Sequence, residues 1–186
     1  VSSRRQRQMC IRDRIYTLRL TGLDMEVKSD VEVASISLFS SAGIGDLGVE
    51  YGCNIPVVLS AELSRKRVKL IRKNYKGRKV MKCDISKRTS SIKKNALKIL
   101  GQKRPLLMTL SPPCQGMSTN GAGKIAAEVK KGKRPKHDKR NKLLIPGLNL
   151  INSLQPEYFL IENVPNMKNT IIRWRKKPKK LIEMIQ

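Results

Sequence analysis

The stretch VASISLFSSAGIGDLG, residues 33–48, decides the fold. Residues 33–39 alternate apolar and small polar side chains, which is the pattern of a half-buried strand. Gly43, Gly45 and Gly48 follow at once and predict a turn that leads into a helix. A strand, a glycine-rich turn and a helix in this order predict the first unit of a parallel α/β sheet.

The rest of the chain repeats this alternation. Further strands are predicted at residues 55–59 (ending in Ala61-Glu62), 79–84, 106–110 and 158–161, and helices at 64–74, 86–103 and 143–154. Residues 119–142 are rich in glycine and lysine and predict a long mobile loop, whereas residues 181–185 predict the start of another helix. The pattern predicts an α/β fold with a mainly parallel sheet and right-handed crossovers.

The charge of the chain favours a polyanionic partner. Its 186 residues suffice for one domain with a real core, and 40 Lys and Arg against 14 Asp and Glu give a formal net charge of +26. So large an excess on a small domain points most simply to nucleic acid. The alternative is a lysine-rich composition that affects only solubility. Nucleic acid is favoured because the basic residues also cluster.

Cysteine spacing and hydropathy exclude other classes. The four cysteines form no CxxC pair and the chain has one histidine, so no zinc site is expected. Free thiols suit a reducing compartment, and we expect a cytoplasmic, DNA-associated protein of prokaryotic or viral type. No apolar run approaches the ~20 residues that span a bilayer, so no membrane partner is expected. Residues 1–14 predict a disordered basic arm that need not be native.

Unusual residues follow each predicted strand, where open α/β sheets bind their ligands. The glycine turn follows the first strand, and the next four strands are followed by Glu62, Asp84, Cys114 and Glu162. Five such positions in order favour a site over packing alone.

The hexapeptide SPPCQG, residues 111–116, presents a thiol directly after the predicted strand at 106–110. Its prolines restrict the backbone around Cys114, and a thiol on rigid backbone suits a nucleophile. A buried structural cysteine beside a proline turn is the alternative. The hexapeptide by itself leaves both open.

Two of the acids suit a nucleoside. The glycine turn lacks the spacing of the dinucleotide fingerprint and is by itself equally consistent with a structural turn. Glu62, about 20 residues on, is placed to accept hydrogen bonds from ribose hydroxyls; the alternative is a solvated acid paired with Arg65 or Lys66. Asp84 suits an adenine amino group, or else the N-cap of the next helix. A nucleoside cofactor without a diphosphate would use such groups.

These segments resemble, in order, the motifs of the DNA cytosine-5 methyltransferases. LFSSAGIG (38–45) resembles the S-adenosylmethionine motif, SPPCQG (111–116) the catalytic Pro-Cys motif and ENV (162–164) the Glu-Asn-Val motif. DKRN (138–141), followed by Leu143, is similar to the segment that opens the next helix. The resemblance covers about residues 33–167. Its most specific part is the pair of SPPCQG and ENV, in this order and about 50 residues apart.

The resemblance implies a Rossmann-like methyltransferase fold and transfer of a methyl group from S-adenosylmethionine to C5 of cytosine in DNA. It makes Cys114 the nucleophile at C6 and Glu162 the acid at N3, with Pro113 and Asn163 as further catalytic-site residues. Asn163 is expected to fix the loop of Glu162, and Phe39 to pack on adenine unless it is an ordinary core residue. The implied cofactor-binding residues are Phe39, Ser40, Ala42, Gly43, Ile44, Gly45, Glu62, Leu63, Asp84, Ile85 and Pro112.

The implied partner is double-stranded DNA with the target cytosine flipped out. In the family, the loop corresponding to residues 119–142 closes over DNA, and its nine Lys and Arg would make closure salt-dependent. A solvated surface loop is the alternative, and His137 within it is read as a surface residue.

Family members normally continue beyond the position of Gln186 with an arginine-bearing strand, a target-recognition region and a last helix. We therefore expect residues 33–186 to be a partial catalytic domain, weakly active or inactive alone, which a second chain would complete. An RNA cytosine-5 methyltransferase of the same fold and a noncatalytic basic nucleic-acid-binding remnant are the alternatives. The intact Cys114 and Glu162 count against the remnant. A restriction-modification role rests on family association alone.

Overall fold

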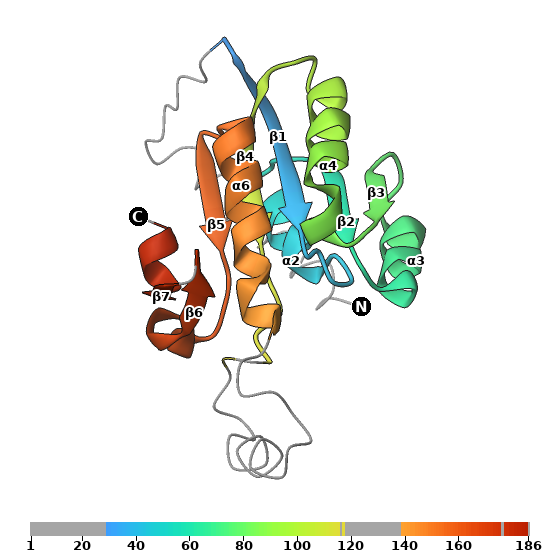
Figure 1. Ribbon diagram of the computed structural model, residues 1–186. Coiled ribbons are helices and arrows are strands. Elements are labelled where there is room, and N and C mark those ends of the chain that lie inside the picture. Colours follow the sequence, from blue (N-terminus) through green and yellow to red (C-terminus); the bar gives the residue numbers. More distant parts are fainter. Residues whose placement is uncertain (1–28, 116, 118–138, 176, 186) are drawn as a thin grey trace.

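Five parallel strands form the central sheet of the computed structural model, which describes residues 29–115, 117, 139–175 and 177–185 (Figure 1). The sheet order is β3-β2-β1-β4-β5, and every neighbouring pair is parallel. The prediction of a mainly parallel α/β sheet is confirmed. The strands are β1 (Val31–Leu38), β2 (Val57–Glu62), β3 (Lys79–Lys82), β4 (Arg104–Leu110) and β5 (Tyr158–Ile161).

The order of the strands creates the site. The chain runs outward from β1 to β2 and β3, then crosses back to place β4 on the other side of β1. Such a reversal leaves a crevice at the carboxyl ends of the strands, and this crevice is where open α/β sheets bind ligands. The glycine turn and the four residues predicted to follow the other strands therefore all lie along one edge of the sheet.

Helices connect the strands. The sheet is covered in part by α4 and α6, which lie side by side (Figure 1). Their buried residues Ile92 and Leu150 join a core with Met108 and Leu110 of β4. The helical segments between strands are α2 (Ile44–Leu47), a π-helix (Gly48–Gly52), α3 (Arg65–Asn74), α4 (Ile85–Ile99), a 3-10 helix (Lys139–Leu143) and α6 (Leu144–Leu154).

Local signals explain where two of these helices begin. Ser64 caps α3 by accepting a hydrogen bond from the backbone N–H of Arg67 at 3.5 Å, and Asp84 caps α4. Helix α3 buries Val68 and Ile71 against Val80 of β3 in a second, smaller core. None of the helices within the described ranges is long and apolar enough to cross a membrane.

The basic segment near the end of the chain forms structure that the sequence did not predict. Strands β6 (Ile171–Trp174) and β7 (Lys177–Lys180) pair as an antiparallel hairpin, preceded by a 3-10 helix at Pro165–Asn169. The buried side chains of Ile172 and Leu181 hold this hairpin against the main core. The helix expected at residues 181–185 is only a 3-10 turn, Ile182–Met184.

Other expectations shift or fall outside the described residues. Helix α4 ends at Ile99 rather than at residue 103, and residues 139–142 belong to a 3-10 helix rather than to a loop. The basic arm at residues 1–14, the loop residues 119–138 and His137 lie outside the described residues.

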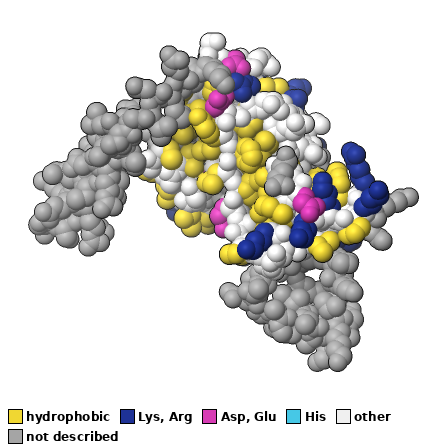
Figure 2. Space-filling model, turned by 90° about the vertical axis from the view of Figure 1, so that its left-hand side faces the viewer, with side chains coloured by type: hydrophobic (Ala, Val, Ile, Leu, Met, Phe, Trp, Pro, Cys, Tyr) yellow, Lys and Arg dark blue, Asp and Glu magenta, His cyan; other side chains and the backbone are white. Residues whose placement is uncertain are grey.

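Strand β5 lies at one edge of the sheet, and its residues Tyr158, Phe159 and Leu160 are roughly half exposed. Figure 2, which views the β5 side, shows hydrophobic side chains gathered there.

Candidate active site

The carboxyl ends of the five strands open into one cavity of about 440 Å³. This cavity brings together the following residues that the sequence predicted: Phe39, Glu62, Leu63, Asp84, Ile85, Pro112, Pro113, Cys114 and Glu162. Ser41, Ser64, Arg67, Cys83, Ser111, Gln115 and Leu143 complete its lining without having been assigned a role from the sequence. Most of these residues are adjacent in the sequence to predicted ones. Their position next to a predicted strand end could therefore have indicated them.

The glycine turn contributes Phe39 and Ser41 to this cavity and has a strained backbone conformation. Phe39, Ser41 and Gly43 all have positive φ, at 58°, 51° and 80°. For Phe39 and Ser41 this left-handed geometry costs roughly 1–3 kcal/mol each, so the surroundings must enforce it. The buried Ser40 contributes by donating its hydroxyl to the carbonyl of Ser37 at 2.8 Å, and its amide to the carbonyl of Ala61 at 3.2 Å.

Several predicted residues do not line the cavity. Ser40 and Gly43 are buried within the turn, Ala42 and Asn163 are half-buried, and Ile44 and Gly45 are exposed. Ile44 is 74% exposed, and a Cβ added at Gly45 would meet nothing within 4 Å. Their assignment to the cofactor therefore remains a proposal.

Glu62 joins the first two strand ends. The residue is only 5% exposed, and its carboxylate accepts the amide of Ser41 at 2.9 Å and that of Ser64 at 2.8 Å. The alternative of a solvated acid paired with Arg65 or Lys66 is wrong, because the acid is buried and its nearest cation is Arg67, at 3.9 Å. Each carboxylate oxygen can accept a second hydrogen bond, which leaves capacity on the cavity side.

Asp84 caps α4, as its alternative interpretation stated. One oxygen, Oδ1, accepts the amide of Ser86 at 3.0 Å and its hydroxyl at 2.6 Å. The other, Oδ2, has no hydrogen-bond partner among the described residues. Capping and a contact with a ligand are therefore compatible. Beside it, burial raises the pKa of the Cys83 thiol; the charge of Asp84 adds to that rise and Arg88 opposes it.

Cys114 lies on the cavity wall rather than in the core. Its side chain is half-buried, and its backbone carbonyl accepts the amide of Met117 at 2.8 Å, which closes the turn after β4. Arg140, in the 3-10 helix that precedes α6, donates to the side-chain carbonyl of Gln115 at 3.4 Å. The thiol is thus presented to the cavity by a turn that is fixed on both sides.

The Glu-Asn-Val segment is attached to the cysteine turn by two amide side chains. Glu162 is exposed at the cavity, and its backbone amide continues the sheet by donating to the carbonyl of Leu110 at 2.9 Å. Asn163 donates to the carbonyl of Pro112 at 3.1 Å and accepts the amide of Val164 at 2.9 Å. Asn166, which the sequence did not single out, donates to the carbonyl of Met117 at 2.9 Å.

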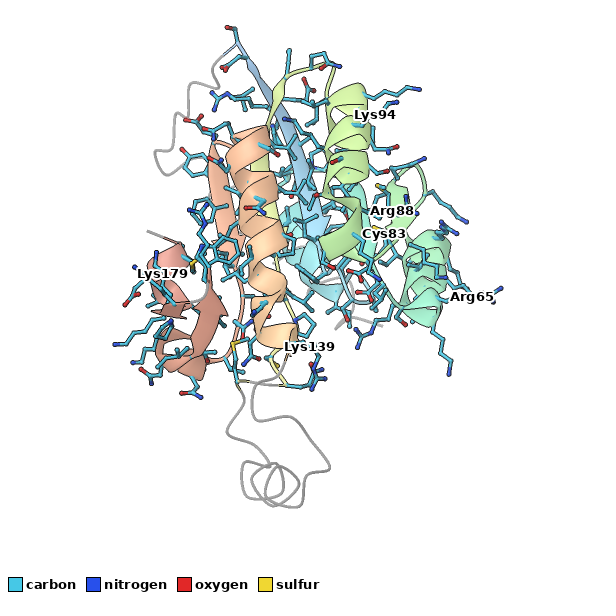
Figure 3. All side chains as sticks on the ribbon, viewed as in Figure 1. Arg65, Cys83, Arg88, Lys94, Lys139 and Lys179 are labelled. Carbon is cyan, nitrogen blue, oxygen red and sulfur yellow. The ribbon has the colours of Figure 1, made fainter. Side chains whose placement is uncertain are left out.

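Basic side chains lie around this edge of the sheet. Figure 3 shows Cys83, which follows β3, close to Arg88 of α4, and it shows Arg65 on α3 and Lys139 in the 3-10 helix before α6. Arg67 also lines the cavity and is about half exposed. Such an arrangement attracts anions to the mouth of the cavity.

The chain belongs to the C-5 cytosine-specific DNA methylase family, whose model matches residues 33–184. It is 35% identical over 133 residues to the Type II methyltransferase M1.HgaI of Avibacterium volantium, covering 72% of this chain and 35% of that protein. It is 30% identical over 132 residues to the Type II methyltransferase M1.HphI of Haemophilus parahaemolyticus, covering 71% and 32%. The chain therefore spans about a third of the length of the curated relatives that it matches.

The fold has a counterpart among solved structures. A candidate DNA modification methyltransferase encoded within an E. coli prophage superposes with a TM-score of 0.56 at 26% identity. The match covers 73% of this chain and 33% of that one. Together with the family match, it confirms the Rossmann-like methyltransferase fold inferred from the order of the motifs.

Proposed function

We propose that this chain carries the cofactor-binding and nucleophile-bearing part of a DNA cytosine-5 methyltransferase that uses S-adenosylmethionine. One observation carries the proposal: a single cavity joins Cys114 and Glu162 to Glu62 and Asp84, each from a different strand end. A thiol and acids in one cavity suit covalent chemistry beside a bound nucleoside better than they suit packing.

The cavity fits the proposed cofactor. Its volume is in the range of small-molecule sites, and Phe39, Leu63 and Ile85 supply apolar walls. The unused acceptor capacity of Glu62 would hold ribose hydroxyls, and the second oxygen of Asp84 would accept from the adenine amino group. When bound, the cofactor supplies an activated methyl group.

The residues around the thiol suit the reaction on the base. The thiolate of Cys114 would add to C6 of cytosine, and the electron pair of the C5–C6 double bond would move toward C5 and N3. Glu162 would hold a proton at N3 and so stabilise the charge that develops there. After C5 is methylated, loss of its proton expels the thiolate and restores the ring. Asn163, through its hydrogen bond to the carbonyl of Pro112, would keep Cys114 and Glu162 in fixed positions relative to each other.

The proposed substrate is a cytosine flipped out of double-stranded DNA. The family match and the charge of +26 support a DNA substrate. Because the match covers only 35% and 32% of the relatives with Type II names, we include a second chain that supplies the remaining regions, and a restriction-modification role, in the proposal.

Covalent trapping tests the proposal. DNA that contains 5-fluorocytosine should form an adduct stable to denaturation when mixed with the cofactor and the chain, alone or with a co-expressed C-terminal portion of a relative. The fluorine cannot leave C5 as a proton does, so the thiolate is not expelled. Cys114→Ser should abolish the adduct, whereas Cys53→Ser, at an exposed free thiol, should keep it.

The outcomes separate the candidate functions. An adduct with fluorocytosine RNA and none with DNA would move the proposal to an RNA methyltransferase. No adduct with either, under every complementation, would contradict the catalytic proposal and favour a noncatalytic binding protein.

A further inference from the structure

A cluster of Asp46, Glu50, Tyr75 and Arg78, built around a buried ion pair, lies beside the glycine turn and outside the cavity lining. Arg78 donates from Nη1 to Asp46 Oδ2 at 2.5 Å and from Nη2 to Glu50 Oε1 at 2.6 Å. The side chains of Arg78 and Asp46 are only 2% and 4% exposed. We call these four residues the Arg78 cluster.

The cluster connects the turn to the sheet beneath it. Asp46 in α2 also accepts the hydroxyl of Ser37 in β1 at 2.7 Å and that of Ser60 in β2 at 3.4 Å. Glu50 accepts the amide of Val57, where β2 begins, at 3.2 Å. The guanidinium therefore links the helix after the turn to the two strands that the turn connects.

Tyr75 extends the cluster to the turn itself. Its ring lies 4.0 Å from the guanidinium carbon of Arg78, and its hydroxyl donates to the carbonyl of Gly43 at 2.6 Å. A Cβ added at Gly43 would come within 2.6 Å of this ring, so glycine is required there on steric grounds as well as by its positive φ. Burial raises the pKa of Tyr75 and Arg78 opposes that rise, so the hydroxyl is a donor at neutral pH, as that of an ordinary tyrosine is.

Stability by itself does not account for such a cluster. Buried ion pairs are costly to desolvate, and apolar residues of similar volume often stabilise a fold as well or better. What the cluster does provide is fixed geometry, because its hydrogen bonds meet the turn at Gly43 and directly after it at Asp46. Phe39 and Ser41, the turn residues that line the cavity, have strained backbones that need such support.

We propose that Tyr75 and Arg78 are positioning residues for the cofactor, which act by holding the 39–45 turn in its binding conformation. This inference rests on the proposed function, since it assumes that the cavity takes S-adenosylmethionine. Neither residue lines the cavity, so both would act through the turn rather than by contact with the ligand.

Two measurements on the whole chain test it, with Tyr75→Phe as the main variant. This change keeps the ring over Gly43 and removes only the hydroxyl. Hydrogen exchange followed by mass spectrometry should show faster exchange in the peptide covering residues 39–47, where the amides of Ser40, Ser41 and Gly43 are hydrogen-bonded. Isothermal titration calorimetry should show the Kd for S-adenosylmethionine raised about fivefold, as expected for one lost hydrogen bond.

Tyr51→Phe is the matched control, because Tyr51 is 64% exposed on the neighbouring π-helix, and it should change neither measurement. Arg78→Lys keeps the charge but loses the planar fork, and should raise the Kd more than Tyr75→Phe does. Each titration is run well below the thermal unfolding midpoint of the variant, so that the whole sample is folded. Under this condition a residue that only stabilises the fold would leave the Kd unchanged, whereas a positioning residue would raise it.

The outcomes are distinguishable. If the unmodified chain does not bind S-adenosylmethionine, the proposed cofactor site fails, and the exchange data still decide whether the cluster holds the turn. If Tyr75→Phe leaves exchange in residues 39–47 unchanged, or if the cofactor binds both variants as it binds the unmodified chain, the positioning role is overturned.

Discussion

The two sides of the cavity are held in different ways. On the β1–β3 side, Glu62 is buried and bonded to two backbone amides, and the Arg78 cluster supports the turn from below. On the β4–β5 side, Cys114 is half-buried and Glu162 exposed, and the amide side chains of Asn163 and Asn166 hold their segments. The described residues thus hold the side proposed for the cofactor (the cofactor side) more firmly than the side proposed for the base (the base side).

The largest expected effect is on the free energy of unfolding, and it tests how much the buried Arg78 pair contributes on the cofactor side. Arg78→Met removes one partner of a buried ion pair and leaves Asp46 uncompensated, so the free energy of unfolding should fall by about 3–5 kcal/mol in urea titrations. Lys103→Met removes an ion pair to Glu32 in which both side chains are nearly half exposed, and should cost under about 1 kcal/mol. Equal losses would show that burial gives the Arg78 pair no larger share of stability than an exposed pair has.

The sequence was most informative about the strand ends. In a parallel sheet the carboxyl ends of all strands share one edge, so acids and a cysteine placed after successive strands must lie near each other. Glu62, Asp84, Cys114 and Glu162 accordingly line one cavity although about 100 residues separate the first from the last.

The Arg78 cluster could not be predicted in the same way. Arg78 looks like any of 40 basic residues, and its partners are set by how α2 packs over β1 and β2. The only local signal was Asp46, an acid within a glycine-rich turn that has no basic neighbour in the sequence. The hairpin of β6 and β7 escaped prediction because KPKK lacks the apolar alternation of a strand, and all four residues are exposed.

A second, smaller effect concerns the packing beneath the cysteine turn. Helix α6 approaches β4 closely at Gly147, where an added Cβ would clash with the buried side chain of Leu110. Gly147→Ala should therefore lower the free energy of unfolding by about 1–3 kcal/mol in the same titrations. Gly48→Ala makes the same change at a helical position with nothing within 4 Å, and should be neutral or stabilising. A stable Gly147→Ala would show that the base side tolerates rearrangement of its support.

A third effect should separate the two sides functionally. Asn163→Ala removes the hydrogen bond to Pro112 and frees the Glu162 segment from the cysteine turn. We expect the rate of adduct formation with fluorocytosine DNA to fall about tenfold, with little change in the Kd for S-adenosylmethionine. Asn152→Ala on the exposed face of α6 is the control. An equal loss of cofactor affinity would mean that the two sides are coupled.

The smallest effect is a pH dependence on the cofactor side. Burial raises the pKa of Cys83, and the nearby charge of Asp84 raises it further. Iodoacetamide reacts with the thiolate, so a raised pKa means a smaller reactive fraction at a given pH. At pH 8, Cys83 should be alkylated a few-fold more slowly in the folded chain than in urea, by mass spectrometry, and the difference should narrow toward pH 10.

Asp84→Asn isolates the electrostatic part of this shift. Asparagine caps a helix about as well as aspartate, so α4 should keep its start while the charge beside the thiol is lost. The pKa of Cys83 should then move down toward its ordinary value, and alkylation at pH 8 should speed up by about twofold. The exposed Cys53, labelled in the same sample, reports any general change in reagent or folding. Because Cys83 and Asp84 both line the cavity, slower labelling on addition of S-adenosylmethionine would place the cofactor on this side, whereas unchanged labelling would contradict that placement.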